Sequence, residues 1–124
     1  MSGLSDTEYK HAQMVSALAK PGEAIIETLS PDRAHIWHML TGLVGEVGEL
    51  VDAFKKHIIY NKTLDFENAI EELGDIEFYL EGIRQGLQIT RKETLHRNVE
   101  KLSVRYSEGT YSDQQASARV DKQA

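Results

Sequence analysis

The stretch that decides the fold is residues 31–59, which read PDRAHIWHMLTGLVGEVGELVDAFKKHII. Apolar side chains recur in it at steps of three and four, the spacing that places them on one face of an α-helix. Ser30 can cap this helix, and Pro31 suits its first position. The predicted buried face comprises Ile36, Leu40, Leu43, Val44, Val47, Val51, Phe54 and Ile58.

Three further helices are predicted on either side of this stretch. Residues 6–18 form one, which ends before the Pro21-Gly22 breaker. Residues 66–87 form another, capped by Asp65, and residues 91–106 form the last, opened by a capping box from Thr90. The last two have apolar stripes of their own: Ala69, Leu73, Ile76, Leu80, Ile83 and Leu87 on one, and Leu95, Val99, Leu102 and Tyr106 on the other.

The predicted fold class is therefore all-α, an antiparallel four-helix bundle. We expect residues 1–106 to form one domain and residues 107–124 a polar tail with one short helix at about 112–120. A second apolar surface is indicated by Met39, Leu50, Phe78 and Tyr79. Helices with two apolar sides in so small a domain predict a homo-oligomer.

Composition excludes several classes of function. The 124 residues contain no cysteine, which rules out a disulfide scaffold, a thiolate zinc site and a cysteine nucleophile. The net charge of −6 argues against a nucleic-acid partner, which requires a basic face. No apolar run is long enough for a membrane span, and the first residues do not read as a secretory signal. We therefore expect a cytoplasmic protein.

Two acidic pairs lie beside the apolar stripes. Glu46 and Glu49 are about 60° apart around one helix, and Glu72 and Asp75 have the same relation on the next. If these helices pack antiparallel, the pairs converge, and four ionised carboxylates require a neutralising cation. Hard oxygen ligands favour Mg²⁺, with Mn²⁺ as the alternative. Gly42, Gly45 and Gly48 in the same region indicate close approach of a helix or ligand.

Other interpretations of these residues remain open. Acidic residues at this spacing usually form a solvated helix face. A ferritin-like di-iron site needs Glu-x-x-His on two helices, which neither acidic pair provides. His35 and His38 precede the acidic pair, and His35 is expected at the edge of the site.

The two acidic motifs resemble those of MazG-like nucleoside triphosphate pyrophosphohydrolases. The matching segments are LVGEVGEL at residues 43–50 and EELGDIEFYL at residues 71–80, with 22 residues between Glu49 and Glu72. Residues 55–65 and 98–106 resemble two further segments of that family, so the likeness covers nearly the whole chain. Gly45 stands where the family has the first Glu of its double-Glu motif.

The resemblance implies Mg²⁺-dependent hydrolysis of (deoxy)nucleoside triphosphates to the monophosphate and pyrophosphate, for sanitising or regulating nucleotide pools. The ligands carried over are Glu46, Glu49, Glu72 and Asp75, and we favour Glu49 as the general base. It also implies a homodimer or a dimer of dimers, because the pocket of this family commonly forms between subunits.

Cationic and aromatic side chains are needed for the rest of the substrate. Asn98, Lys101 and Arg105 share one stripe of the 91–106 helix and are candidates for a phosphate clamp. Lys56 is a secondary phosphate candidate. The further substrate-binding candidates, which could line a base pocket or reach the nucleotide, are Asn68, Tyr79, His35 and Trp37.

Two alternatives to this function remain. One is a related all-α pyrophosphohydrolase that acts on dUTP, dCTP or phosphoribosyl-ATP. The other is a helical oligomerisation module without activity.

Overall fold

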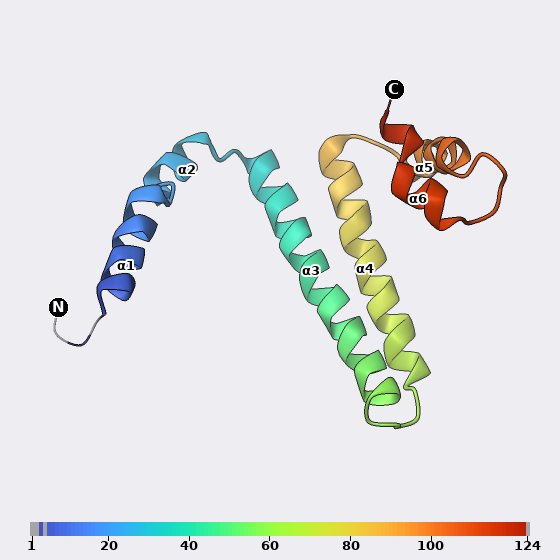
Figure 1. Cartoon of the computed structure of the whole chain (residues 1–124), viewed down its shortest axis with the longest axis horizontal. Helices are drawn as coiled ribbons and strands as arrows, with labels where there is room; N and C mark the ends of the chain where they lie inside the picture. Colours follow the sequence, from blue (N-terminus) through green and yellow to red (C-terminus); the bar gives the residue numbers. More distant parts are fainter. Residues whose placement is uncertain (1–2, 4, 124) are drawn as a thin grey trace. The chain divides into compact units, whose positions relative to one another are not determined.

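A computed structural model describes residues 3 and 5–123, and this part of the chain contains helices and no strand. The α-helices are α1 (Asp6–Leu18), α2 (Gly22–Thr28), α3 (Pro31–Ile58), α4 (Phe66–Leu87), α5 (Arg91–Arg105) and α6 (Asp113–Ala118), and η1 (Val120–Lys122) is a 3₁₀ turn (Figure 1). The predicted all-α class is confirmed. None of these helices is both long and apolar enough to cross a bilayer.

The chain divides into two compact units, one up to Ala34 and one from His35 onward. In the first unit, Ser5 caps α1 and forms a reciprocal capping box with Glu8. Helix α2 was not predicted, because a Pro-Gly pair such as Pro21-Gly22 is typical of the end of a helix. Pro21 instead takes the N-cap position, where its missing N–H is not needed, and the helix begins at Gly22.

The longer predicted helices begin where their capping residues are. The backbone N–H of Arg33 donates to Ser30 Oγ at 3.2 Å, and that of Asn68 donates to Asp65 Oδ1 at 3.1 Å. The N–H of Glu93 donates to Thr90 Oγ1 at 3.0 Å. These bonds satisfy backbone donors that a helix leaves free in its first turn.

In the second unit, α3 and α4 form an antiparallel pair joined by a short loop (Figure 1). Gly42 faces the ring of Tyr79 so closely that a Cβ at Gly42 would lie 2.2 Å from Tyr79 Cε1. Gly82 has the same relation to Met39, since its Cβ would lie 2.2 Å from the sulfur. Glycines on both helices therefore let the backbones approach. The close approach predicted for Gly45 and Gly48 is not seen among the described residues, because nothing outside their own stretch of helix lies within 4 Å of either Cβ position.

The face of α3 that packs on α4 overlaps the predicted one only at its edge, where Ile36 and Leu43 are half-buried. The most buried positions are Met39 at 6% and Ala53 at 9% exposure, which lie beside the predicted stripe, and Met39 belongs to the second apolar surface indicated by the sequence. Val44, by contrast, is 73% exposed and Val51 61%. The physical reason is that the small residues on α3 and α4 allow closer packing than the branched ones. The predicted stripe is mostly uncovered in this chain: Leu40, Val44, Val47, Val51, Phe54 and Ile58 are all exposed.

After α5 the chain turns back on itself, and both α6 and η1 pack beside α5 (Figure 1). Helix α6 falls within the segment expected to hold one short helix, and its N-terminus is capped by Ser112, which accepts from the N–H of Gln115 at 3.0 Å. Arg119 then adopts a left-handed backbone with φ of 48° and turns the chain into η1. The 3₁₀ turn itself was not predicted.

Candidate metal and nucleotide site

Three carboxylates from α3 and α4 converge between the helices. Glu46, Glu72 and Asp75 each offer an oxygen, and these oxygens all lie within 4.8 Å of one another. Glu46 and Glu72 are half-buried, whereas Asp75 is exposed. The predicted convergence of acidic residues from facing helices is therefore present for these three. The arrangement provides a set of hard oxygen donors with one side open to solvent.

Glu72 is held in an environment that opposes its negative charge. A hydrogen bond with the carboxyl group of Glu46 is the main cause that raises the pKa of Glu72 to about 7, and burial and the charges of Glu46, Glu49 and Asp75 add to it. Its Oε2 atom is buried and has no hydrogen-bond partner. A buried acceptor without a partner is costly unless something satisfies it.

A divalent cation fits these residues. It would satisfy the unpartnered Glu72 oxygen and would offset the repulsion that raises the pKa of that group. Glu49 lies near enough for its charge to act on Glu72 but is not part of the close cluster. A carboxylate at this position is adjacent to the cation site without being committed to it.

Two of the predicted substrate residues flank the cluster along α4. Asn68 is one turn before Glu72 and half-buried, and Tyr79 is one turn after Asp75 with its ring against Gly42. The Tyr79 ring also meets Phe78 edge-on, with centroids 5.1 Å apart. Both side chains therefore lie within one helical turn of the carboxylates.

The other candidates on α3 lie farther from the cluster. His35 is about 16 Å before Glu46 along the helix axis, at 1.5 Å per residue. Its Nε2 is 2.9 Å from the carbonyl oxygen of Gly82, and a carbonyl only accepts, so Nε2 carries the proton. Trp37 is 67% exposed. Lys56, near the other end of α3, pairs with Asp52 at 3.1 Å.

The predicted phosphate clamp lies on α5, and one of its members has a partner. Asn98 is exposed and Lys101 is half-buried. Arg105 donates through Nε to Asp121 Oδ1 at 2.7 Å and through Nη2 to Oδ2 at 3.2 Å. Asp121 was missed at the level of sequence, because 16 positions separate it from Arg105 and no helical spacing relates the two residues.

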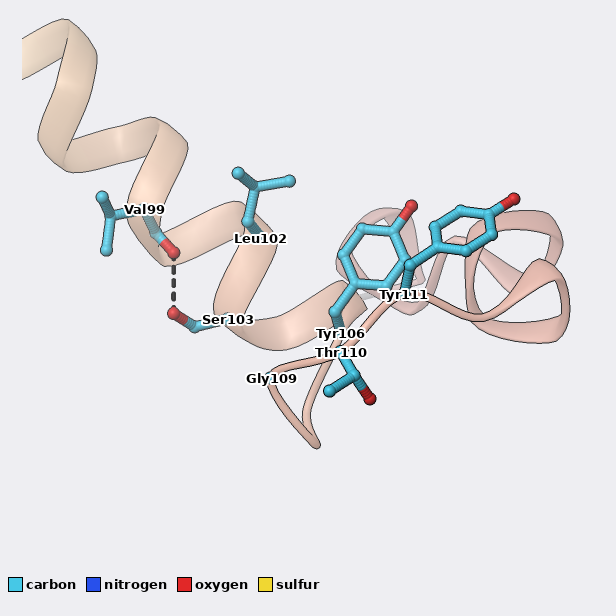
Figure 2. A pocket seen from close by; sticks show the side chains of 7 residues that line it. All are labelled: Val99, Leu102, Ser103, Tyr106, Gly109, Thr110 and Tyr111. Atoms are coloured by element: carbon cyan, nitrogen blue, oxygen red, sulfur yellow. Dashed lines mark hydrogen bonds between the residues drawn. The ribbon is translucent and has the colours of Figure 1, made fainter.

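A hollow of about 510 Å³ lies where α5 ends and the chain turns back (Figure 2). Tyr106 and Tyr111 form one side of it with ring centroids 5.9 Å apart. The hydroxyl of Ser103 donates to the carbonyl of Val99 at 2.8 Å on the other side. The remaining lining residues are Leu102, Gly109 and Thr110. This surface carries no titratable group other than the two phenols.

Comparison with known families identifies the class of protein. The profile of the MazG nucleotide pyrophosphohydrolase domain matches residues 36–109, which contain α4 and α5 and all but the first turns of α3. No curated protein and no solved structure matches the chain.

Because the match spans more than half of the sequence, the chain belongs to the MazG nucleotide pyrophosphohydrolase family. The resemblance inferred from the acidic motifs is confirmed. Membership supports nucleotide pyrophosphohydrolase chemistry in general, and the carboxylate cluster lies within the matched region.

Proposed function

We propose that this protein hydrolyses nucleoside or deoxynucleoside triphosphates between the α- and β-phosphorus atoms, releasing the monophosphate and pyrophosphate. The observation that carries the proposal is the cluster of Glu46, Glu72 and Asp75, with its unpartnered Glu72 oxygen, inside the family match. Such a reaction would sanitise or regulate the nucleotide pool of a cytoplasm.

The carboxylates would hold Mg²⁺, or Mn²⁺ in its place, through Glu46, Glu72 and Asp75, with Glu49 as a further ligand or as the base. When bound, this ion supplies charge neutralisation and orientation of the phosphate oxygens. Glu49 is our candidate general base, because its carboxylate is near Glu72 but outside the close cluster. It would accept the proton of the attacking water at a carboxylate oxygen.

The remaining candidates would bind the substrate around this centre. Asn68 and Tyr79 lie one turn to either side of the carboxylates, where the sugar and base can reach them. Lys101 and Arg105 on α5, with Asn98, would bind the departing pyrophosphate, because cations are needed to hold its charge. Lys56, His35 and Trp37 are proposed as more distant contacts.

Self-association belongs to the same proposal. The apolar residues of α3 that do not face α4 include Val44 at 73%, Val51 at 61% and Ile58 at 68% exposure. Contiguous apolar surface of this kind is typical of protein interfaces. We propose a homodimer or a dimer of dimers in which a second copy covers this stripe and completes an antiparallel bundle around the site.

The test is a pyrophosphate-release assay with Mg²⁺ and a panel of ribo- and deoxyribonucleoside triphosphates. We expect pyrophosphate and monophosphate in equal amounts, and a loss of at least about a hundredfold in kcat for Glu49→Ala, the scale of general-base catalysis. Glu71→Gln is the matched control, because Glu71 is exposed on α4 next to Glu72.

Each other result of this assay has a definite meaning. Release of orthophosphate in place of pyrophosphate would exclude α–β cleavage. Turnover confined to dUTP, dCTP or phosphoribosyl-ATP would identify the related enzyme. An assembled protein that binds no Mg²⁺ and turns over no substrate would be the inactive helical module.

A further inference from the structure

The guanidinium group of Arg105 is engaged by a carboxylate in the way that it would engage a phosphate. Its Nε and Nη2 donate in parallel to the two oxygens of Asp121, at 2.7 and 3.2 Å. The side chains are shielded from solvent, with 15% exposure for Arg105 and 4% for Asp121. This two-pronged fork is the geometry by which arginine binds both carboxylate and phosphate groups.

A second cation of the proposed clamp also acts on Asp121. The hydrogen bond from Arg105 holds the pKa of Asp121 below its usual value, and the charge of Lys101 contributes to the same shift. Lys101 and Asp121 line one hollow of about 390 Å³ on the flank of α5, whose other charged lining residues are Arg97, Lys122 and the acid Glu100. The Asp121 carboxylate thus lies among the cations that the proposed function assigns to the pyrophosphate.

The segment that carries Asp121 is attached by a turn with an unfavourable backbone. Arg119 has φ of 48°, a left-handed conformation that a residue with a Cβ rarely adopts. The turn is held locally by three bonds within residues 118–123. They run from the N–H of Lys122 to the carbonyl of Arg119 at 2.9 Å, from the N–H of Gln123 to the carbonyl of Val120 at 3.1 Å, and from Gln123 Nε2 to the carbonyl of Ala118 at 2.8 Å. These bonds all lie within residues 118–123, so the segment can keep its own turn when the Arg105 pair opens.

We propose that Asp121 is an internal competitor for the phosphate groups of the substrate, and that residues 119–123 close over Arg105 when no nucleotide is bound. The proposal rests on the function proposed above, because it regulates the same phosphate clamp. Binding of a triphosphate or of pyrophosphate replaces the carboxylate on the guanidinium and frees the segment. The apparent affinity for the phosphate ligand is then the intrinsic affinity multiplied by the fraction of molecules in which the clamp is open.

The alternative is that the ion pair only tethers the end of the chain to α5. A tether predicts that removing Asp121 leaves phosphate affinity unchanged. A third role, in which Asp121 holds Arg105 in the correct orientation for phosphate, predicts weaker binding. When Asp121 is replaced, the Kd for pyrophosphate should therefore fall for a competitor, stay the same for a tether and rise for an orienting residue.

The experiment measures binding of inorganic pyrophosphate with Mg²⁺ by isothermal titration calorimetry. The variants are Asp121→Asn, which keeps the shape and removes the charge, and a chain that ends at Ala118. We expect Kd to fall about tenfold in both, as for a clamp that is open in about a tenth of the molecules. The KM for the triphosphate should fall in the same proportion, with kcat within about twofold.

Two controls isolate the contact. Asp113→Asn removes another acid near the end of the chain, on α6, whose partner is the hydroxyl of Tyr111 and not Arg105, and it should leave Kd unchanged. In an Arg105→Ala background, the further change Asp121→Asn should give a much smaller gain, because only Lys101 remains of the two clamp cations that act on Asp121. If Asp121→Asn does not fold, the chain ending at Ala118 provides the same comparison.

An unchanged or increased Kd in folded variants would overturn the proposal. Its failure is distinguishable from failure of the proposed function. Turnover with an unchanged Kd would support the proposed enzymatic function and overturn the role of Asp121 as a competitor. Tighter pyrophosphate binding without hydrolysis of any triphosphate would support the role of Asp121 as a competitor and overturn the proposed enzymatic function.

Discussion

Carboxylate oxygens of Glu46 and Glu72 lie within 4.8 Å of each other across the interface of α3 and α4. Two carboxyl groups this close favour a proton on one of them, and that preference links the candidate site to pH. In the absence of a cation the proton is held by Glu72, whose pKa is raised from 4.5 to about 7.

The first prediction concerns stability of the metal-free protein. The folded state binds this proton more tightly than the unfolded chain does. The contribution of Glu72 to the free energy of unfolding should therefore be highest below about pH 4.5 and should fall between about pH 4.5 and 7. Thermal unfolding in chelator across this range measures the effect. Glu72→Gln should remove that fall, and an equal pH dependence in the variant would contradict the assignment.

The second prediction concerns cation binding. Mg²⁺ should raise the melting temperature at pH 8 and much less at pH 5, because the ligand must first lose its proton. Asp75→Asn should weaken the Mg²⁺-dependent stabilisation by about tenfold or more in apparent Kd, whereas Glu77→Gln, two positions away on an exposed face, should not. A titration monitored by melting temperature compares the two, and equal shifts in both variants would argue against the site.

The third prediction tests the close approach of the helices. Gly42→Ala places a methyl group 2.2 Å from the Tyr79 ring, and overpacking of this kind costs about 1–3 kcal/mol. Gly45→Ala is the matched control three residues away. Its Cβ meets nothing within 4 Å, so the helix should gain up to about 1 kcal/mol. Chemical denaturation measures both, and loss of stability in Gly45→Ala would show that something else contacts that position.

The fourth prediction addresses self-association. Val51→Glu places a charge in the uncovered apolar stripe, at a side chain that is 61% exposed in the isolated chain. The monomer should be little affected, while the assembly should dissociate, because a charge without a partner is expensive in an apolar interface. Light scattering with size-exclusion chromatography gives the mass. Lys62→Glu, in the exposed loop after α3, controls for added negative charge.

Much of the helical architecture could be predicted from the sequence, because capping residues and breakers act locally. Ser30, Asp65 and Thr90 begin their helices as expected. The face of α3 that packs on α4 could not be predicted from apolar spacing. Helix packing depends on how closely two backbones approach, and this is decided by Gly42 and Gly82.

In the candidate site, too, one part could be predicted from the sequence and another could not. The convergence of Glu46 with Glu72 and Asp75 follows from helical spacing and antiparallel pairing, so the pattern was sufficient. The partner of Arg105 was not predictable. Asp121 reaches Arg105 because the backbone turns at Arg119, which is in a left-handed conformation. An arginine in the sequence does not indicate that conformation.

The paired contacts of α3 and α4 also separate the geometry of the ligands from the loop that joins the helices. Gly42 meets Tyr79, and seven residues earlier on α3 His35 meets Gly86, seven residues later on α4. The two antiparallel helices thus contact each other through glycines facing larger side chains, and this packing sets the positions of the carboxylates. Because residues 59–64 lie outside these contacts, a change in the length of that connection should leave the carboxylates in place as long as Asp65 still caps α4.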